Sequence, residues 1–367
     1  MKIGVVGCGN ISDIYFKNLT SVFNNTEVLA CVDLDEQKAL TKKEKYAIPY
    51  VMTLDEMLEC KDIDLILNIT TPQSHYSITK KALMAGKHVY VEKPLALHYS
   101  EGKELVELAA EKLLYLGCAP DTFLGAGIQT CEKLINEGKI GKPVAAGAYM
   151  LCHGHETWHP SPEFYYDIGG GPLFDMGPYY ITALVRLLGR AESVTACCGK
   201  AFQERIITSK DKYGKKIDVK VDTHNAAIIK FESGTIVTLV TSFDVWGNNM
   251  PNLEIYGTDG SLSIPDPNTF GGVVRATLTD KKKFEDVELC SPYYDNSRGI
   301  GLSEMVLAIS EGRANNASGL LALHVLEIME SIIKSSKEGK AIILESTPSQ
   351  PVVLDWNIPL GDLKTFG

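Results

Sequence analysis

Short apolar runs alternate with helical patterns near the start of this chain, and this alternation limits the possible folds more than any other feature. The apolar runs occupy residues 2–6, 28–32, 63–69, 88–91 and 114–118. Runs without polar alternation, such as residues 63–69, are typical of strands that are buried on both faces. Strands that alternate with helices at this spacing predict a doubly wound parallel sheet.

The pattern changes after residue 120. Helical periodicity covers residues 121–138 and 172–189, and most of residues 193–289 forms predicted strands separated by turn signals. With 367 residues, the chain is long enough for two domains of ordinary size. We therefore expect an α/β domain at residues 1–120 and an α+β domain with a large antiparallel sheet at residues 121–367.

A glycine-rich turn directly follows the first apolar run, with Gly7 and Gly9 spaced as in GxGxx and Ser12 where a third glycine usually stands. Glycines allow a tight turn in which backbone amides approach a pyrophosphate, while the next helix points its positive N-terminus at the phosphates. The strand before the turn and the helical pattern after it support this interpretation. A dinucleotide cofactor is therefore predicted to bind at Gly7, Gly9, Asn10 and Ile11.

The second apolar run ends at Asp33. A carboxylate about 20 residues past the glycines can accept both ribose hydroxyls of the adenosine half and would repel a 2′-phosphate. Leu34, rather than an arginine, comes next. The pattern therefore favours NAD over NADP as the cofactor. The alternative is that Asp33 caps the helix expected to begin near Glu36.

The apolar run at residues 88–91 leads directly into Glu92, Lys93 and Pro94. Proline lacks a backbone donor and ends a strand, so the acid and the lysine fall at the carboxyl end of a predicted central strand. Ligands of open α/β sheets bind at that end. Glu92 and Lys93 are therefore candidate site residues, and the alternative is an ordinary ion pair in solvent.

Charge and cysteine content exclude several classes of function. The formal net charge of −10 provides no basic surface, so we expect no nucleic-acid partner and no membrane partner. The sequence has no apolar run of membrane-spanning length and no signal-peptide pattern at its start. The nine cysteines are scattered and include no CxxC pair. This composition predicts a cytoplasmic protein without a disulfide framework.

Three motifs occur in an order that is typical of one known family. They are Gly7-Cys-Gly9, Val91-Glu-Lys-Pro94 and Gly169-Gly-Gly-Pro-Leu-Phe-Asp-Met-Gly177. In this combination the chain resembles the Gfo/Idh/MocA family of glucose–fructose oxidoreductase and inositol dehydrogenase over nearly its whole length. The resemblance implies a Rossmann domain followed by an α+β domain with a large, mostly antiparallel open sheet. It also implies a homo-oligomer, because that sheet commonly joins subunits in the family.

The resemblance further implies roles for matched residues. Lys93 would lie between nicotinamide and substrate, and Pro94 is often cis in the family. Asp175 matches the aspartate of the D-x-G-x-H/Y motif, and Tyr179 stands at its last position, where inositol dehydrogenases carry histidine. The segment that lines the cofactor corresponds to Thr70, Thr71, Pro72 and His75, together with Glu92.

Without that histidine, either Tyr179 or Lys93 must accept the proton of the substrate hydroxyl. A free tyrosine, with a pKa of about 10, is a poor base near neutrality. A lysine ammonium ~4 Å away would stabilise the phenolate by about 4 kcal/mol, before desolvation opposes it. We favour Tyr179 beside Lys93, with Asp175 on the same face of one predicted helix. The alternatives are Lys93 as the base, and Tyr179 as an ordinary core aromatic.

Residues 152–171 form the segment richest in histidine and aromatic residues. Tryptophan and tyrosine faces stack on sugar rings and histidines bind hydroxyls, so this segment is predicted to be a substrate-binding loop. A zinc site is the weaker interpretation because the spacing matches no common module, and no metal is predicted. A surface loop without a role is the other alternative. The candidate substrate-binding residues are His153, His155, Trp158, His159 and Tyr165, with Asp121 and Trp246 outside the loop.

These features together predict an NAD-dependent dehydrogenase that oxidises a secondary hydroxyl of a sugar, glycoside or cyclic polyol by hydride transfer. The loop and residues 119–124 resemble bacterial enzymes that oxidise glycosides at C3, which gives a narrower hypothesis. One alternative is an NAD-dependent glycosidase that cleaves its substrate through transient oxidation and elimination. The other is a non-catalytic regulator that senses NAD or sugar, although a sensor needs neither Lys93 nor Asp175.

Overall fold

The computed structural model describes residues 1–278, 283–349, 351–355 and 359–365. The chain forms two compact units. The first comprises Met1–Ala126, Cys290–Leu326 and Thr347–Gly367, and the second comprises Gly127–Leu289 and Glu327–Ser346. From the sequence we expected all residues after 120 to belong to the second domain. In the structure the chain returns to the first unit for α9 (Ile300–Glu311) and the segments beside it.

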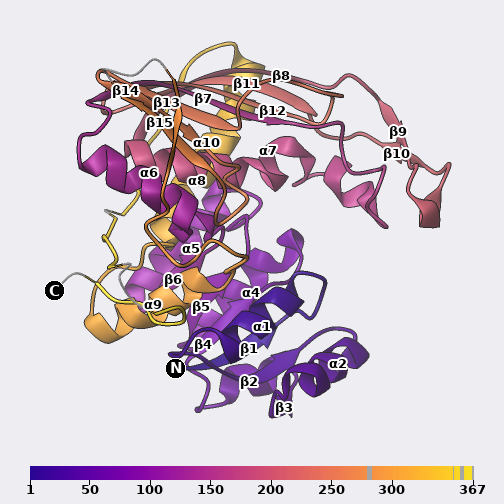
Figure 1. Ribbon diagram of the computed structural model, residues 1–367. Coiled ribbons are helices and arrows are strands. Elements are labelled where there is room, and N and C mark those ends of the chain that lie inside the picture. Colours follow the sequence, from indigo (N-terminus) through magenta and orange to yellow (C-terminus); the bar gives the residue numbers. More distant parts are fainter. Residues whose placement is uncertain (279–282, 350, 356–358, 366–367) are drawn as a thin grey trace. The chain divides into compact units, whose positions relative to one another are not determined.

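The first unit is built on a six-stranded sheet with the order β3-β2-β1-β4-β5-β6 (Figure 1). Every adjacent pair of its strands is parallel, as the sequence predicted. The strand order reverses between β1 and β4, and the carboxyl ends of strands at such a reversal are where ligands bind. The strands are β1 (Lys2–Val6), β2 (Glu27–Val32), β3 (Tyr50–Val51), β4 (Leu65–Asn68), β5 (His88–Val91) and β6 (Leu116–Cys118).

Helices follow these strands where the sequence provides start signals. Thr53 and Glu56 form a reciprocal capping box at the start of α3, and Pro72 stands in the first turn of α4, where a missing N–H costs nothing. Met57 and Leu105 are 0% exposed in the core between helices and sheet. The helices are α1 (Ser12–Ser21), α2 (Glu36–Tyr46), α3 (Leu54–Glu59), α4 (Pro72–Met84) and α5 (Tyr99–Glu111).

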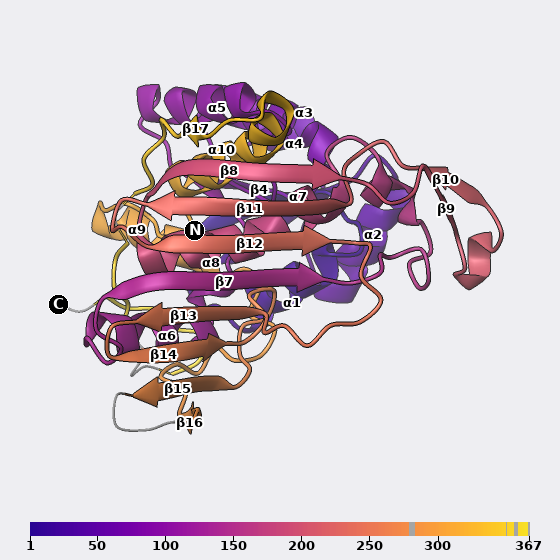
Figure 2. The same cartoon turned by 90° about the horizontal axis from the view of Figure 1, so that it is seen from above.

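The second unit contains a nine-stranded sheet with the order β16-β15-β14-β13-β7-β12-β11-β8-β17, most of which Figure 2 shows face on. Its strand pairs are antiparallel except β7 with β12, which run parallel. The predicted fold class, a parallel Rossmann domain plus a large, mostly antiparallel sheet, is therefore confirmed. The strands are β7 (Pro143–Leu151), β8 (Ala191–Gly199), β11 (His224–Phe231), β12 (Ile236–Ser242), β13 (Leu253–Gly257), β14 (Gly260–Ile264), β15 (Val274–Leu278), β16 (Glu285–Val287) and β17 (Ile342–Ile343).

One face of this sheet is covered by helices. There α7 (Gly171–Asp175) packs on β11 and β12, and α8 (Gly177–Leu188) packs on β7 (Figure 1). Successive residues of β11 differ accordingly, because Ile229 is 0% exposed whereas Ile228 is 46% exposed. The second face therefore presents apolar side chains to solvent. The remaining elements are α6 (Ala126–Asn136), α10 (Gly319–Glu338) and a separate hairpin of β9 (Glu204–Ile206) and β10 (Lys216–Asp218).

Two observations concern the chain's surroundings. Within the ranges given above, no helix is both long enough and apolar enough to cross a membrane. All nine cysteines lie in described segments and are free thiols, and Cys197 is the exposed one among them.

Candidate active site

The glycine-rich turn after β1 has the backbone geometry that the motif requires. Gly7 has a φ of +105°, and a Cβ atom on it would lie 2.7 Å from the carbonyl oxygen of Ile69, so only glycine fits. A Cβ atom on Gly9 would meet nothing within 4 Å, which leaves open space beside the backbone. Ile11 is the N-cap of α1. Ser12, at the position of the third glycine, donates its hydroxyl to the carbonyl oxygen of Gly9 at 2.6 Å.

Asp33 directly follows β2 and holds this turn in place. Its carboxylate accepts hydrogen bonds from the backbone N–H of Cys8 at 2.7 Å and of Asp35 at 2.9 Å. The N-cap of α2 is Asp35, whose side chain accepts from the N–H of Gln37 at 3.2 Å. The alternative that Asp33 caps this helix is therefore wrong. Asp33 instead fixes the turn at the point where ribose hydroxyls bind in this type of sheet.

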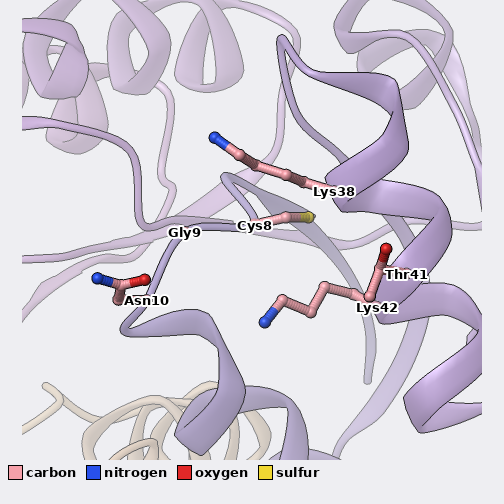
Figure 3. Close-up of a pocket in the computed structure, with 6 residues that line it drawn as sticks. All are labelled: Cys8, Gly9, Asn10, Lys38, Thr41 and Lys42. Carbon is pink, nitrogen blue, oxygen red and sulfur yellow. The ribbon is translucent and has the colours of Figure 1, made fainter. Parts of the chain in front are cut away.

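A cavity of about 250 Å³ lies beside the turn (Figure 3). The turn lines one side and α2 lines the other, through Cys8, Gly9, Asn10, Lys38, Thr41 and Lys42. Lys42 is held by an ion pair with Asp13 at 2.7 Å. The cavity and the open backbone beside Gly9 fit the adenosine and pyrophosphate groups of a dinucleotide.

The turn after β4 places three predicted residues at the start of α4. Thr71 is the N-cap of this helix, Pro72 is its first residue, and the hydroxyl of Thr70 donates to the side chain of Asn68 at 2.7 Å. Thr71 is exposed and Thr70 is half-buried. The predicted cofactor-lining residues thus surround the carboxyl end of a central strand.

His75 joins the turns after β4 and β5. It is 1% exposed, and its ring nitrogens lie 2.7 Å from the carbonyl oxygen of Pro94 and 3.1 Å from that of Thr70. Burial lowers the pKa of His75, so its ring is neutral near neutral pH and has a single N–H, which can donate to only one of these two carbonyl oxygens. The sequence predicted that His75 lines the cofactor, whereas in the structure its buried ring lies between the two turns and contacts the backbone of each.

Glu92 and Lys93 follow β5 in a turn that surrounding residues fix. Glu92 is 8% exposed, and its carboxylate accepts hydrogen bonds from the hydroxyl of Tyr15 and from the backbone N–H of Lys93, each at 2.8 Å. The peptide bond between Lys93 and Pro94 is cis, as the resemblance implied. Both carboxylate oxygens of Glu92 therefore shape the turn that carries Lys93.

Asp175 and Tyr179 lie on two helices rather than on one. Helix α7 ends at Asp175 and α8 begins at Gly177, with Met176 between them. Pro178 explains the break, because it has no N–H for the helical ladder and its ring clashes with the preceding turn. The single helix predicted for this segment is therefore wrong, and the argument from a shared helical face does not hold. Tyr179 is 8% exposed.

Asp175 is paired with a histidine of the aromatic loop. Nε2 of His155 lies 3.8 Å from the Asp175 carboxylate, and the two side chains are 12% and 18% exposed. The ring of His155 contacts those of Tyr165 and Trp158 at centroid distances of 4.1 and 5.2 Å, and His159 packs edge-on against Tyr165 at 5.3 Å. Five predicted residues therefore gather in one cluster. In the described part of the chain, no three His, Cys, Asp or Glu side chains are placed to hold a metal ion.

A buried arginine that the sequence did not single out anchors this loop. Arg205 of β9 donates to Glu156 at 2.8 Å and to the carbonyl oxygen of Phe243 at 2.8 Å, and it forms an ion pair with Asp244. The hydroxyl of Tyr166 also donates to Glu156. The side chains of Arg205 and Glu156 are 4% and 5% exposed. No local sequence pattern identifies Arg205 as a buried anchor, because its partners are distant in sequence and meet it only in the tertiary fold.

His153 and Trp246 form a second aromatic pair next to this anchor. Their rings are stacked at a centroid distance of 3.3 Å and an interplanar angle of 15°. Arg205 donates to the carbonyl oxygen of His153 at 3.2 Å. The two predicted residues are therefore in contact, although they are distant in sequence.

Comparison with known protein families decides the relationship. The model described as "Oxidoreductase family, NAD-binding Rossmann fold" matches residues 1–118, and that of the GFO/IDH/MocA C-terminal domain matches residues 128–263. The chain belongs to the Gfo/Idh/MocA family. Its first domain is an NAD-binding domain, which agrees with the cofactor predicted from the glycine turn and Asp33.

Several known proteins are similar to this Gfo/Idh/MocA chain, each over a different part of its length. An uncharacterized oxidoreductase of Schizosaccharomyces pombe is 33% identical over 205 residues, which span 53% of this chain and 54% of that protein. The scyllo-inositol 2-dehydrogenase (NADP(+)) of Bacillus subtilis is 23% identical over 94% of this chain and 96% of its own length. Apo levoglucosan dehydrogenase has a TM-score of 0.82 at 20% identity, covering 94% of this chain and 99% of that one. This last similarity concerns the fold alone.

One residue predicted to bind substrate in this Gfo/Idh/MocA chain has a structural role instead. Asp121 is 1% exposed, and one carboxylate oxygen accepts hydrogen bonds from the backbone N–H of Gly299 at 2.8 Å and of Gly301 at 3.1 Å. These N–H groups open α9, whose positive end favours a carboxylate. Because Asp121 is buried and committed to α9, we do not retain it as a substrate ligand.

Replacing Asp121 with asparagine is expected to stabilise the protein near and above neutral pH. Burial, the largest influence, raises the pKa of Asp121 from 3.8 to about 6. The folded state therefore binds the proton more tightly than the unfolded state, so stability falls as pH rises through this range. The full loss is about 3 kcal/mol. Asparagine keeps a carbonyl oxygen for both N–H groups and does not ionise, so it avoids the loss.

Urea unfolding of both proteins from about pH 4 to about pH 8 measures this effect. The variant should gain stability relative to the wild type as pH rises. Asp62→Asn is the matched control, because the Asp62 side chain is 76% exposed and should show little such trend. A difference between Asp121→Asn and wild type that does not change with pH would refute the explanation.

Proposed function

We propose that this protein is an NAD-dependent dehydrogenase that oxidises a secondary hydroxyl of a sugar, glycoside or cyclic polyol by hydride transfer. The observation that carries the proposal is the turn after β5. There Glu92 and His75 contact the backbone of Lys93 and Pro94 and fix Lys93 at the carboxyl end of the sheet that also forms the dinucleotide cradle. A protein that only senses NAD or sugar has no need of a lysine held in this way.

The chain's own residues supply binding and proton transfer in this reaction. NAD, when bound, supplies the acceptor for the hydride. Gly9 and Asp33 hold the dinucleotide. The proton of the substrate hydroxyl passes either to Tyr179, while the Lys93 ammonium donates a hydrogen bond to the substrate oxygen, or to Lys93 in its neutral amine form. Tyr179 is 8% exposed, and such burial disfavours a phenolate unless a cation compensates its charge, so the base role of Tyr179 depends on the lysine ammonium.

The substrate class follows from the aromatic loop of the second unit. Trp158 and Tyr165 pack against His155, which lies beside Asp175. This cluster combines hydrogen-bonding groups for hydroxyls with aromatic faces for the apolar side of a ring. The Bacillus subtilis relative is named for its action on scyllo-inositol, a cyclic polyol. Oxidation at C3 of a glycoside is the narrower form of the proposal. Mass spectrometry of the product tests it, and oxidation at C1 would exclude it.

We also propose that the protein is a cytoplasmic homo-oligomer, assembled through the open face of the nine-stranded sheet. Ile228, Ile236 and Tyr256 are 46%, 53% and 39% exposed. Contact between two such faces would bury apolar area that is otherwise in water. The nine free thiols suit a reducing compartment. Sedimentation velocity tests the assembly, and a monomer at all concentrations would contradict it.

Incubation with NAD and a panel of neutral polyols, hexoses and glycosides is expected to produce NADH with at least one member, as followed by absorbance. NADP should support a rate at least about tenfold lower, because Asp33 repels a 2′-phosphate. Cleavage of a glycoside without accumulation of NADH would indicate the glycosidase instead. Binding of NAD without turnover of any member would indicate a regulator. Equal rates with both cofactors would refute the role given to Asp33.

A further inference from the structure

Trp246 is the most exposed large aromatic side chain near the substrate loop. It is 82% exposed, yet its ring lies flat on that of His153 at 3.3 Å. Exposed aromatic surface that is held in one orientation is typical of ligand sites, because solvation of such surface is unfavourable until a ligand covers it. The free side of the indole is large enough for one sugar ring, whose C–H face packs on aromatic rings.

The buried anchor keeps this stacked pair in place. Arg205 donates to the carbonyl oxygen of His153 at 3.2 Å and is itself held by Glu156 at 2.8 Å. It also pairs with Asp244, two residues before Trp246. The same guanidinium therefore restrains both segments that carry the stacked rings. A platform fixed before binding loses little conformational entropy when a ligand arrives.

Arg205 also fixes the protonation of the His153 ring beneath the indole. Nε2 of His153 lies 3.5 Å from Nη1 of Arg205, and a guanidinium can only donate, so Nε2 accepts. Burial, together with the charge of Arg205, lowers the pKa of His153 and keeps the ring neutral. The proton of a neutral ring is then on Nδ1, and this buried atom has no hydrogen-bond partner in the described part of the chain. Because Nδ1 is buried, a ligand on the free face of the indole does not reach it, and His153 contributes the neutral ring on which Trp246 stacks.

The platform adjoins the cluster around Asp175. His153 is two residues from His155, whose Nε2 lies 3.8 Å from the Asp175 carboxylate. Two residues of extended chain span at most ~7 Å, which is about the length of one sugar ring. The backbone positions of His153 and His155 are therefore at most about one sugar ring apart, which suits a ligand with one ring beside Asp175 and a second, linked ring on Trp246.

We propose that the stacked pair of His153 and Trp246 is a subsite for a second pyranose ring, joined by a glycosidic bond to the ring that is oxidised. The inference rests on the proposed function for the identity of the first ring. It makes a disaccharide or similar glycoside the preferred substrate class, rather than a free monosaccharide. The indole packs on the C–H face of the second ring, and the ring of His153 supports the indole from its other face.

Trp246→Ala is expected to raise KM for a disaccharide such as cellobiose or maltose by about five- to tenfold, the size of one aromatic stacking contact. KM for glucose should stay within about twofold, and kcat should not change for either sugar. Trp246→Phe should restore most of the loss. Tyr213→Ala, at a tyrosine that is 75% exposed elsewhere in the second unit, is the matched control and should change neither KM.

Equal rises in KM for glucose and disaccharide, or no rise for either, would overturn the inference. A changed sedimentation coefficient in Trp246→Ala would also overturn it, because the surface would then join copies of the chain. Calorimetry of disaccharide binding to the NADH-loaded protein separates this inference from the proposed function. Binding that Trp246→Ala weakens, without oxidation of any sugar, supports the subsite and refutes the dehydrogenase. Absence of disaccharide binding to the wild type refutes the subsite whatever the enzyme oxidises.

Discussion

Replacement of Lys93 with methionine is expected to lower kcat by about 1,000-fold or more, which is the scale of a lost acid–base and electrostatic group. Affinity for NADH should stay within about threefold, because Glu92 and His75 shape the turn through its backbone and not through the lysine amine. Methionine keeps most of the apolar stem and removes the charge and the transferable proton. Steady-state kinetics with the best substrate of the panel and a fluorescence titration with NADH provide the measurement.

Lys103→Met is the matched control for this change, since Lys103 is an exposed residue of α5 in the same unit. It should leave kcat within about twofold. Turnover of Lys93→Met at a near-normal rate would refute a catalytic role for the lysine. Tyr179→Phe, assayed beside it, decides which group takes the proton. A loss of about 100-fold assigns the proton to Tyr179, and near-normal turnover leaves Lys93 as the base.

Local patterns were sufficient to predict the parallel sheet of the first unit. The strand predicted at residues 2–6 coincides with β1, and the glycine motif gave the turn in which Gly7 has a positive φ. Each of these signals lies within a few residues of the structure that it specifies. Pro178 was an equally local signal for a new helix, but helical periodicity over the whole segment hid the break between α7 and α8.

Contacts between distant residues could not be predicted from the sequence. Arg205 bonds to Glu156 and Asp244, which are 49 and 39 residues away along the chain. Asp121 accepts a hydrogen bond from the N–H of Gly299, 178 residues later. Asp121 was predicted to bind substrate because it follows the end of a predicted strand, a position at which a free carboxylate would face a ligand. In the folded chain the start of α9 lies beside Asp121, and two of its backbone N–H groups donate to the Asp121 carboxylate.

Arg205→Met is expected to lower the free energy of unfolding by about 3 to 5 kcal/mol, which is typical when one partner of a buried charge cluster is removed. The carboxylates of Glu156 and Asp244 would remain in side chains that are only 5% and 10% exposed, without the cation that compensates their charge. Thermal or urea unfolding measures the loss, which corresponds to a fall in Tm of about 4 to 6 °C for a chain of 367 residues.

The matched control is Arg275→Met, which breaks an ion pair with Asp286 whose side chains are 53% and 73% exposed, and it should cost less than about 1 kcal/mol. Equal losses in the two variants would show that the cluster does not anchor the loop. Adding Glu156→Gln and Asp244→Asn to Arg205→Met should recover much of the stability, because uncompensated charge causes the loss. A triple variant no more stable than Arg205→Met would attribute the loss to packing. Since Arg205 also bonds the carbonyl of His153 at 3.2 Å, the triple variant should regain stability without regaining the wild-type KM for sugar.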